Sequence, residues 1–325
     1  MPHPADTVLS LLHNHKDACV SGQTLAQKLG VTRAAVWKAI EALRADGYGI
    51  ESMPAKGYRL VSIPDRLGER EIALGLNTRV FGRTVHALDS VDSTNSYASR
   101  LAVDGAPDGT LVVSESQTAG RGRLGRNWVS PPGVNIYMSL ILRPNMLPID
   151  APFITLAASV ALAWTLKDGY KLDAAIKWPN DVLLSGRKAS GILTEMSSEP
   201  DRIRHVVLGV GIDVNMKPSE FPDDIRAQST SVMAELGRSV NRAELLCRFL
   251  EEFEPVYELL VGGAGASVLD LWRGLSCTLG RRVVVKTLRG DLTGLARDID
   301  ASGGLILELD GGGTQTITSG DVGFM

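Results

Sequence analysis

The sequence of 325 residues predicts an α+β multidomain protein. Three successive patterns along the chain lead to this prediction. Residues 1–63 have helical periodicity and end in a short hairpin, whereas residues 64–272 alternate predicted strands with helices. Residues 273–325 have β-strand character punctuated by Gly and Asp. We therefore expect an N-terminal helical domain, a central α/β domain with a mixed sheet, and a small C-terminal barrel of antiparallel strands.

Composition limits the class of protein. The formal net charge of −3 excludes a generally basic nucleic-acid coat but leaves room for a local basic element. The three cysteines, Cys19, Cys247 and Cys277, are scattered and show no metal-binding spacing. The N-terminus lacks a signal-peptide pattern, and the apolar run at residues 157–166 is too short and broken to span a membrane. These features predict a cytoplasmic protein without a metal cluster or a membrane partner.

The N-terminal segment carries start and stop signals for two helices joined by a tight turn. Ser21 can cap a first helix that ends at Gly30, and Thr32 can cap a second helix that runs to about Ala45. Apolar residues at i, i+4 and i+7 of the second helix predict one buried face. A short hairpin at about residues 49–60 follows this helix.

Helix, turn, helix and hairpin wing in this order resemble a winged helix-turn-helix DNA-binding domain. The second helix would enter the major groove with its N-terminal residues nearest the bases. The candidate DNA-binding residues are Gln23, Thr32, Arg33, Ala34, Trp37, Lys38 and Lys56. Residues 1–63 hold seven Lys and Arg against five Asp and Glu, so we expect tight binding to need a dimer. A helical hairpin used for protein contact is the alternative.

A loop rich in glycine and arginine lies in the central segment. Residues 120–128 read Gly-Arg-Gly-Arg-Leu-Gly-Arg-Asn-Trp. Glycine lets the backbone approach a ligand closely, and the arginine fork suits phosphate or carboxylate. The pattern favours a loop that closes over a small anion, and a flexible basic surface loop is the alternative.

Other segments supply candidate partners for this loop. Ser93, Thr94 and Asn95 precede a predicted helix, where capping is the commoner use and hydrogen bonding to a polar ligand is the alternative. Residues 176–182 read Ile-Lys-Trp-Pro-Asn-Asp-Val at the entry to a strand, and Lys188 follows in a turn, where a lysine is usually solvated. Glycines within residues 206–215 would let a strand pass close against a flat ligand.

Taken together, these motifs resemble the biotin protein ligase family, and the whole chain resembles its bifunctional members. Those members are biotin–[acetyl-CoA-carboxylase] ligases that also repress the biotin operon. The likeness depends on Gly120–Arg123, Lys177–Asp181 and Lys188–Ile192 occurring in this order. It implies a central domain like that of class II aminoacyl-tRNA synthetases and an SH3-like C-terminal β-barrel.

The resemblance also implies roles for individual residues. Ser93, Thr94 and Gln117 would hydrogen-bond the biotin ureido ring. The rest of the biotin site would comprise Asn95, Gly120, Arg121, Gly122, Arg123, Lys188, Gly191 and Gly209. Arg123 and Lys188 would also hold the α-phosphate, and the remaining nucleotide contacts would be Arg126, Trp128, Lys177 and Asn180. Asp181 would orient Mg²⁺ or the incoming lysine, which makes Arg123, Lys188 and Asp181 the expected catalytic residues.

The implied reaction uses ATP, biotin and Mg²⁺, and it passes through biotinyl-5′-AMP. The implied partners are the biotin carrier domain of acetyl-CoA carboxylase, operator DNA and a second copy of the chain in a ligand-induced homodimer. Two alternatives are a ligand-sensing repressor without ligase activity and a lipoate-type ligase. The presence of Arg123 and Lys188 argues against the first, and the Gly-Arg-Gly-Arg loop together with the winged helix favours biotin over lipoate.

This chain departs from the family pattern at two places. Asp213 stands where many relatives have Asn, and Leu124 and Asn127 stand at positions that are often basic. We expect these departures to affect loop closure or dimer stability rather than the residues that hold carboxylate and phosphate.

Overall fold

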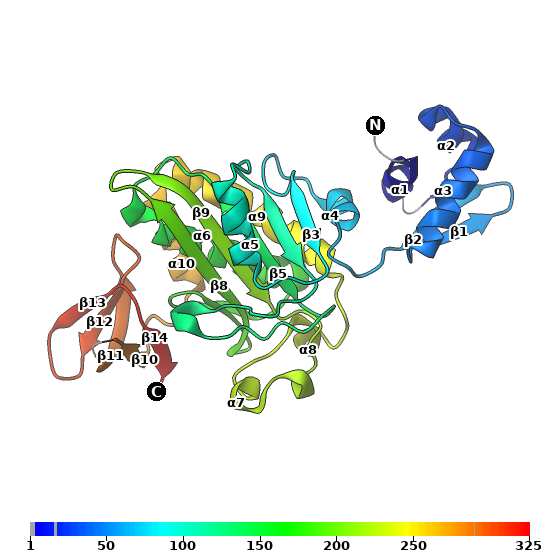
Figure 1. The fold of residues 1–325 in the computed structure, drawn as a ribbon. Helices are drawn as coiled ribbons and strands as arrows, with labels where there is room; N and C mark the ends of the chain where they lie inside the picture. Colours follow the sequence, from blue (N-terminus) through cyan, green and yellow to red (C-terminus); the bar gives the residue numbers. More distant parts are fainter. Residues whose placement is uncertain (1–3, 16–17, 289) are drawn as a thin grey trace. The chain divides into compact units, whose positions relative to one another are not determined.

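The computed structural model describes residues 4–15, 18–288 and 290–325. The chain divides into two compact units, Met1–Gly75 and Leu76–Met325. Figure 1 shows the N-terminal unit in blue and the sheet-containing larger unit in cyan to red. The elements are described below within each unit.

The N-terminal unit is a helix-turn-helix followed by a hairpin, as predicted. Its elements are α1 (Pro4–His13), α2 (Gly22–Leu29), α3 (Arg33–Ala45), β1 (Gly49–Met53) and β2 (Gly57–Ser62). The Ser21 hydroxyl accepts a hydrogen bond from the Thr24 amide at 3.0 Å, and the Thr32 hydroxyl accepts one from the Ala35 amide at 3.2 Å. Gly30 ends α2 with a φ of +66°, a conformation that favours glycine. Both predicted caps are therefore confirmed.

Residues 62–65 read Ser-Ile-Pro-Asp, which is typical of a linker. A further helix, α4 (Glu69–Gly75), lies beyond them and belongs to this unit. Leu74 packs against the helix-turn-helix core. The Glu71 side chain, only 1% exposed, accepts hydrogen bonds from the Tyr48 hydroxyl and from Arg66 Nε. Burial, reinforced by the Glu71 carboxylate, raises the pKa of Tyr48. The polypeptide that follows the hairpin is thus fastened to the helix-turn-helix.

The larger unit is built on a mixed seven-stranded sheet, as the sequence predicts. Its strands in spatial order are β3 (Val85–Leu88), β4 (Leu111–Ser114), β5 (Ile136–Leu142), β9 (Ile203–Ile212), β8 (Arg187–Ser198), β7 (Asp181–Leu184) and β6 (Ala174–Lys177). β3 and β4 are parallel, and every other neighbouring pair is antiparallel.

Helices cover both faces of this sheet (Figure 1). On one face α5 (Thr94–Val103) packs through Ala98 and Ala102 onto a core that includes Val112, Ile141 and Val207. The opposite face carries α6 (Pro152–Trp164), α9 (Arg242–Val261) and α10 (Gly265–Leu275). The short helices α7 (Asp223–Arg226) and α8 (Val232–Leu236) lie in the connection between β9 and α9. The face of the sheet that carries α5 also carries the side chains that form the candidate site.

Within the described part of the chain, one segment, Pro148–Gly169, is long and apolar enough to cross a membrane by length and composition alone. This segment is longer than the apolar run at residues 157–166 because α6 continues into a π-helical turn, Thr165–Gly169. In this fold 72% of its most apolar window is buried. Its position against the sheet and α9 accounts for an apolar surface on all sides.

The C-terminal part forms a five-stranded antiparallel sheet. In spatial order its strands are β13 (Thr314–Ile317), β12 (Leu305–Leu309), β11 (Gly290–Ile299), β10 (Arg282–Thr287) and β14 (Asp321–Phe324). Buried Trp178, next to β6, joins this sheet to the central domain. Its backbone N–H donates to Thr278 Oγ1 at 2.9 Å, and its indole N–H donates to the Gly303 carbonyl at 3.1 Å. These bonds place β14 beside the candidate site.

A buried ion pair fastens the start of α9 to the sheet. Arg242 is 1% exposed, and its Nη1 lies 2.6 Å from Glu115 Oε2 and donates to the Asn135 carbonyl at 3.3 Å. A cation in the first turn of a helix is disfavoured by the helix dipole, so these acceptors compensate for its position. Arg248 in the same helix pairs with Glu244, and both of these side chains are largely exposed.

We expect Arg242→Met to lower the free energy of unfolding by about 3 kcal/mol, because it leaves Glu115 without its buried partner. Arg248→Met is the matched control in α9 and should cost less than about 1 kcal/mol, since its pair is solvated. Urea unfolding followed by circular dichroism measures both changes. Equal effects of the two substitutions would contradict the stabilising role of the buried pair.

Candidate ligand-binding cleft

A cleft of about 720 Å³ opens between the arginine loop (residues 120–128), the N-terminus of α5, strands β7 to β9 and strand β14. It brings together residues that lie far apart in the sequence. The predicted site residues that line it are Ser93, Thr94, Asn95, Gln117, Arg121, Gly122, Arg123, Arg126, Trp128, Lys177, Asn180, Asp181, Lys188, Gly191 and Gly209.

Gly120 is the predicted site residue that does not line the cleft. It is buried beneath the loop, where an added Cβ would lie 2.5 Å from the Trp128 carbonyl oxygen and 2.7 Å from Ser130 Oγ. Glycine at this position is therefore required by the packing of the loop on itself.

The arginine loop is a closed hairpin. The Gly122 amide donates to the Arg126 carbonyl at 2.7 Å, and the Trp128 amide donates to the Gly120 carbonyl at 2.9 Å. The tip passes through Leu124 and Gly125 with φ of +56° and +73°. A positive φ is unfavourable for leucine, so Leu124 introduces local strain at the tip of the loop. The hairpin places its arginines on both sides of one turn.

Glycines on β8 and β9 let the chain's own side chains lie close to the strands, where the sequence analysis expected a flat ligand. A Cβ on Gly209 would clash with Asn95 Oδ1, and a Cβ on Gly211 would lie 2.5 Å from the Trp128 ring. A Cβ on Gly191 would lie 3.0 Å from the same ring. Side chains from α5 and the loop can therefore lie directly on the strands.

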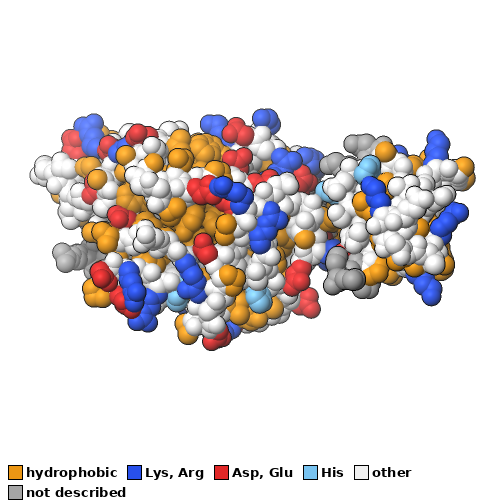
Figure 2. Space-filling model, turned by 90° about the horizontal axis from the view of Figure 1, so that it is seen from above, with side chains coloured by type: hydrophobic (Ala, Val, Ile, Leu, Met, Phe, Trp, Pro, Cys, Tyr) orange, Lys and Arg blue, Asp and Glu red, His pale blue; other side chains and the backbone are white. Residues whose placement is uncertain are grey.

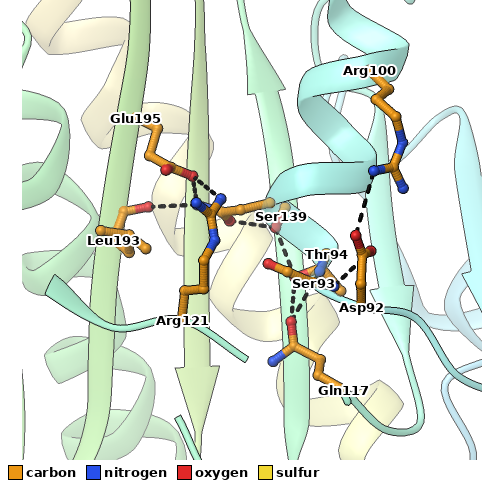
Figure 3. A network of polar contacts seen from close by, with 10 residues as sticks. Asp92, Ser93, Thr94, Arg100, Gln117, Arg121, Ser139, Leu193 and Glu195 are labelled. Carbon is orange, nitrogen blue, oxygen red and sulfur yellow. Dashed lines mark hydrogen bonds and ion pairs between the residues drawn. The ribbon is translucent and has the colours of Figure 1, made fainter. Parts of the chain in front are cut away.

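Neutral polar groups surround one end of the cleft (Figure 3). The Thr94 amide donates to Gln117 Oε1 at 2.9 Å, and Gln117 Nε2 donates to Ser130 Oγ at 3.0 Å. Ser139 Oγ lies 2.8 Å from Thr94 Oγ1 and 2.6 Å from Asn95 Oδ1. Sequence reasoning missed Ser139 because a serine inside an apolar strand gives no local sign of its partners.

The structure corrects the interpretation of Ser93 as the residue that caps the helix α5. Ser93 occupies the N-cap position of α5, but its hydroxyl makes no capping hydrogen bond to the described residues of the helix. The Thr94 amide at this helix end is satisfied by Gln117 instead. Ser93 is only 3% exposed and lines the cleft, so its hydroxyl is available there.

Arg123 lies in the middle of the cation cluster, which we define as Arg121, Arg123, Arg126 and Lys188. Its guanidinium donates to Asn180 Oδ1 at 3.0 Å and to Ser319 Oγ at 3.2 Å. Burial lowers the pKa of Arg123, while the carboxylates of Asp321 and Asp181 act in the opposite direction. An arginine remains charged under these conditions, so the cleft holds a partly desolvated positive charge.

Lys188 lies on β8 and lines the same cleft. Its Nζ lies 2.7 Å from Asp181 Oδ1 and 5.5 Å from the centre of the Trp128 ring. Asp213 lies deeper, at 6% exposure, and accepts a hydrogen bond from Asn135 Nδ2 at 2.9 Å. Burial raises the pKa of Asp213 to about 8, although the nearby Lys188 ammonium opposes the shift. The departure at Asp213 therefore places a buried carboxyl group near Lys188.

The C-terminal sheet completes the cleft, which the sequence did not predict. Asp321 forms an ion pair with Arg126, and Lys177 Nζ lies 5.3 Å from the centre of the Phe324 ring. Asp321 is 195 residues from its partner along the chain, so no local pattern could identify it. The structure thus gives Lys177 and Arg126 partners on β14.

Among the residues that the structure describes, no group of three or more His, Cys, Asp or Glu side chains could hold a metal ion.

The predicted DNA-contacting residues share one property, which is exposure to solvent. All seven are exposed: Gln23, Thr32, Arg33, Ala34, Trp37, Lys38 and Lys56. Trp37 is 54% exposed on α3, which is unusual for a large aromatic side chain.

In Figure 2, basic and acidic side chains are interspersed over the larger unit, in agreement with the small net charge.

Comparison with known proteins finds a separate matching family for each of three parts of the chain. The HTH domain family matches residues 5–59, the Biotin/lipoate A/B protein ligase family matches residues 87–213, and the Biotin protein ligase C terminal domain matches residues 278–325. The bifunctional ligase/repressor BirA of Bacillus subtilis is 41% identical over 303 residues, with 93% of each chain covered. BirA of Escherichia coli is 33% identical, covering 90% of this chain and 88% of the relative.

A solved structure of similar fold is the biotin protein ligase from Aquifex aeolicus in complex with biotin and ATP. It has a TM-score of 0.64 and 28% identity, and the match covers 75% of this chain and 99% of that chain. The matches to both BirA proteins cover at least 90% of this chain. The protein therefore belongs to the BirA family of bifunctional biotin ligase/repressors.

Proposed function

We propose that the protein joins biotin to ATP, forming biotinyl-5′-AMP and pyrophosphate, and then transfers biotin to a lysine of a carrier domain of acetyl-CoA carboxylase. The convergence of the cation cluster beside a neutral polar pocket carries this proposal. The ligand must have an uncharged polar end and an anionic end, as biotin has. The same adenylate would serve as corepressor for operator binding.

The neutral end of the cleft suits the cyclic urea of biotin. Ser93, Thr94 and Gln117 offer hydrogen-bonding groups without charge, and Asn95 and Gly209 form the adjacent wall. A buried site with fixed hydrogen-bonding groups discriminates strongly against ligands that lack matching groups. We assign biotin recognition to these residues together with Arg121, Gly122 and Gly191.

The cation cluster suits the first chemical step. The biotin carboxylate oxygen attacks the α-phosphorus of ATP, the bond to the β-phosphate oxygen breaks, and pyrophosphate leaves. Negative charge grows on the α-phosphate oxygens during this step, and fixed donors that face this charge lower the barrier. We assign Arg123 and Lys188 to the carboxylate and α-phosphate, and Arg126, Lys177, Asn180 and Trp128 to the rest of the nucleotide.

Asp181 fits a role beside Mg²⁺, because Mg²⁺ is usually held by one or two carboxylates and by substrate phosphates. Asp181 lines the cleft 2.7 Å from Lys188, close to where we place the α-phosphate. When bound, Mg²⁺ would neutralise charge on the phosphates. Asp181 would also orient the carrier lysine for the second step, in which its amine attacks the acyl carbon and AMP leaves as the amide forms.

The mixed anhydride hydrolyses if water reaches it, so the arginine loop must close over it. The hairpin of the loop and the partners of its arginines on β8, β7 and β14 suit it to this role. We further propose that loop ordering promotes homodimerisation at an exposed sheet edge, which would couple adenylate formation to repression.

We assign operator binding to residues 1–63, ligation to residues 64–272, and completion of the cleft to residues 273–325. We also propose that the central domain is related in fold to class II aminoacyl-tRNA synthetases and that the five C-terminal strands form an SH3-like barrel. Alternating buried residues such as Val283, Val285, Leu305 and Leu307 support the barrel. The three cysteines are scattered along the chain without metal-binding spacing, which suits the cytoplasm, where we place the protein.

Incubation with biotin, ATP, Mg²⁺ and a biotin carrier domain should release pyrophosphate and modify one carrier lysine, as detected by mass spectrometry. A parallel reaction with lipoate serves as the specificity control. Biotin binding without pyrophosphate release would favour a sensing repressor that lacks ligase activity. Transfer of lipoate but not biotin would favour a lipoate-type ligase.

We expect Arg123→Ala to slow adenylate formation by about 10²- to 10³-fold, because one fixed donor to the developing charge is lost. The variant should also release biotinyl-5′-AMP faster than the wild type, as measured by filter retention of labelled adenylate. Arg202→Ala is the control, since the exposed Arg202 pairs with Glu199 and does not line the cleft. Wild-type retention by Arg123→Ala would show that the role assigned to this arginine is wrong.

We expect Lys38→Ala to weaken DNA binding and to reduce the salt dependence of the affinity by about one phosphate contact. The probe is a duplex selected from a random library by the full-length protein with biotin and ATP. Lys167→Ala, on the larger unit, should bind like the wild type. Specific binding by residues 76–325 alone would rule out the N-terminal unit as the operator-binding element.

A further inference from the structure

Glu195 on β8 is an acidic side chain beside the neutral end of the cleft, and none of the roles above includes it. Its Oε2 accepts a hydrogen bond from Arg121 Nη2 at 3.0 Å and from Asn95 Nδ2 at 2.8 Å. Figure 3 shows Arg121 extending across the strands to Glu195. One carboxylate oxygen therefore joins three elements: the arginine loop, the start of α5 and the sheet.

Glu195 fixes the orientation of the Asn95 amide. Asn95 Nδ2 also donates to the Leu193 carbonyl at 3.3 Å, so both of its partners are acceptors. A flipped amide would place Asn95 Oδ1 against these two oxygens and leave them without the donor. The observed orientation turns Oδ1 toward Ser139, whose hydroxyl lies 2.6 Å away.

Ser139 connects Asn95 to the other polar groups at the neutral end of the cleft. The Ser139 hydroxyl lies 2.6 Å from Asn95 Oδ1 and 2.8 Å from Thr94 Oγ1 and can donate its single proton to either oxygen. The Thr94 hydroxyl donates to Gln117 Oε1 at 3.2 Å, and the Thr94 amide donates to the same oxygen at 2.9 Å. The Asn95 amide that Glu195 orients is therefore linked through Ser139 and Thr94 to Gln117 at the neutral end of the cleft.

Glu195 also binds the arginine loop. The Arg121 side chain is 46% exposed and that of Glu195 is 34% exposed. An ion pair this exposed contributes little while water surrounds it. Its attraction increases when closure of the loop lowers the local dielectric. Ligand binding and the Arg121–Glu195 pair should therefore reinforce each other.

We propose that Glu195 is a positioning residue for biotin, which orients Asn95 and the hydrogen-bonding groups beside it and holds Arg121 over the same end of the cleft. This inference rests on the biotin site of the proposed function. Glu195 acts through Asn95 and Arg121, and its effect should therefore fall on biotin rather than on ATP.

Two substitutions of Glu195 separate its charge from its ability to accept hydrogen bonds. In Glu195→Gln, the amide oxygen can still accept from both Asn95 and Arg121, whereas in Glu195→Met no acceptor remains. We expect Glu195→Met to raise the dissociation constant for biotin about tenfold, and Glu195→Gln to fall between it and the wild type. The Michaelis constant for ATP should change by less than about twofold.

A double-mutant cycle with Arg121→Met tests the coupling directly. The double variant Arg121→Met/Glu195→Met should bind biotin no more weakly than the poorer of the two single variants. Glu199→Gln is the matched control, because Glu199 pairs with Arg202 and Arg204 outside the cleft. Biotin binding is measured by calorimetry on the full-length protein, and thermal unfolding confirms that each variant is folded.

Three results would overturn the role of Glu195 while the wild type still binds biotin. They are unchanged biotin affinity in Glu195→Met, equal losses for biotin and ATP, and multiplicative effects of the two substitutions in the cycle. A wild-type protein that does not bind biotin would overturn the proposed function together with this inference.

Discussion

Positive charge concentrated in one cleft is the constraint on which the rest of the site depends. Arg121, Arg123, Arg126 and Lys188 all line this cleft, and like charges that face one cleft repel one another. Their partners lie in three places: Glu195 on β8, Asn180 and Asp181 at the start of β7, and Asp321 on β14. The loop hairpin, the sheet and the C-terminal domain must therefore assemble together for the cleft to exist.

The second constraint is the close approach of side chains to the sheet. Gly191, Gly209 and Gly211 leave space on β8 and β9 that Asn95 and Trp128 fill. These contacts give the cleft a neutral floor at one end and an aromatic floor at the other. Charge and close packing together explain how one cleft can suit a molecule with an uncharged urea, an apolar body and an anionic end.

Features encoded locally could be predicted from the sequence. Ser21 and Thr32 cap their helices within three residues, so the helix-turn-helix was evident from the chain alone. The motif residues that line the cleft could be selected because glycine, arginine and asparagine occur in an unusual order. The order of a helical segment, a central segment of strands and helices, and a C-terminal segment of strands followed from the patterns along the chain.

Features that depend on distant contacts could not be predicted. Asp321 meets Arg126 only because Trp178 fastens the C-terminal sheet beside β6. Glu195 sits in a strand whose alternation gives no sign of its partners, and α4 joins the N-terminal unit through Leu74 and Glu71 after an apparent linker. Ser93 has the sequence of a cap, yet Gln117 satisfies the helix end instead.

Hydrogen–deuterium exchange of the loop amides would test the central claim most directly. The claim is that the cation cluster closes over an anionic ligand as a unit with β14. Biotin and ATP together should slow exchange at Gly122 and Trp128 and at residues 319–324 in parallel, because both segments hold the same cations. Protection of the loop without protection of residues 319–324, or no protection of either segment, would contradict the account.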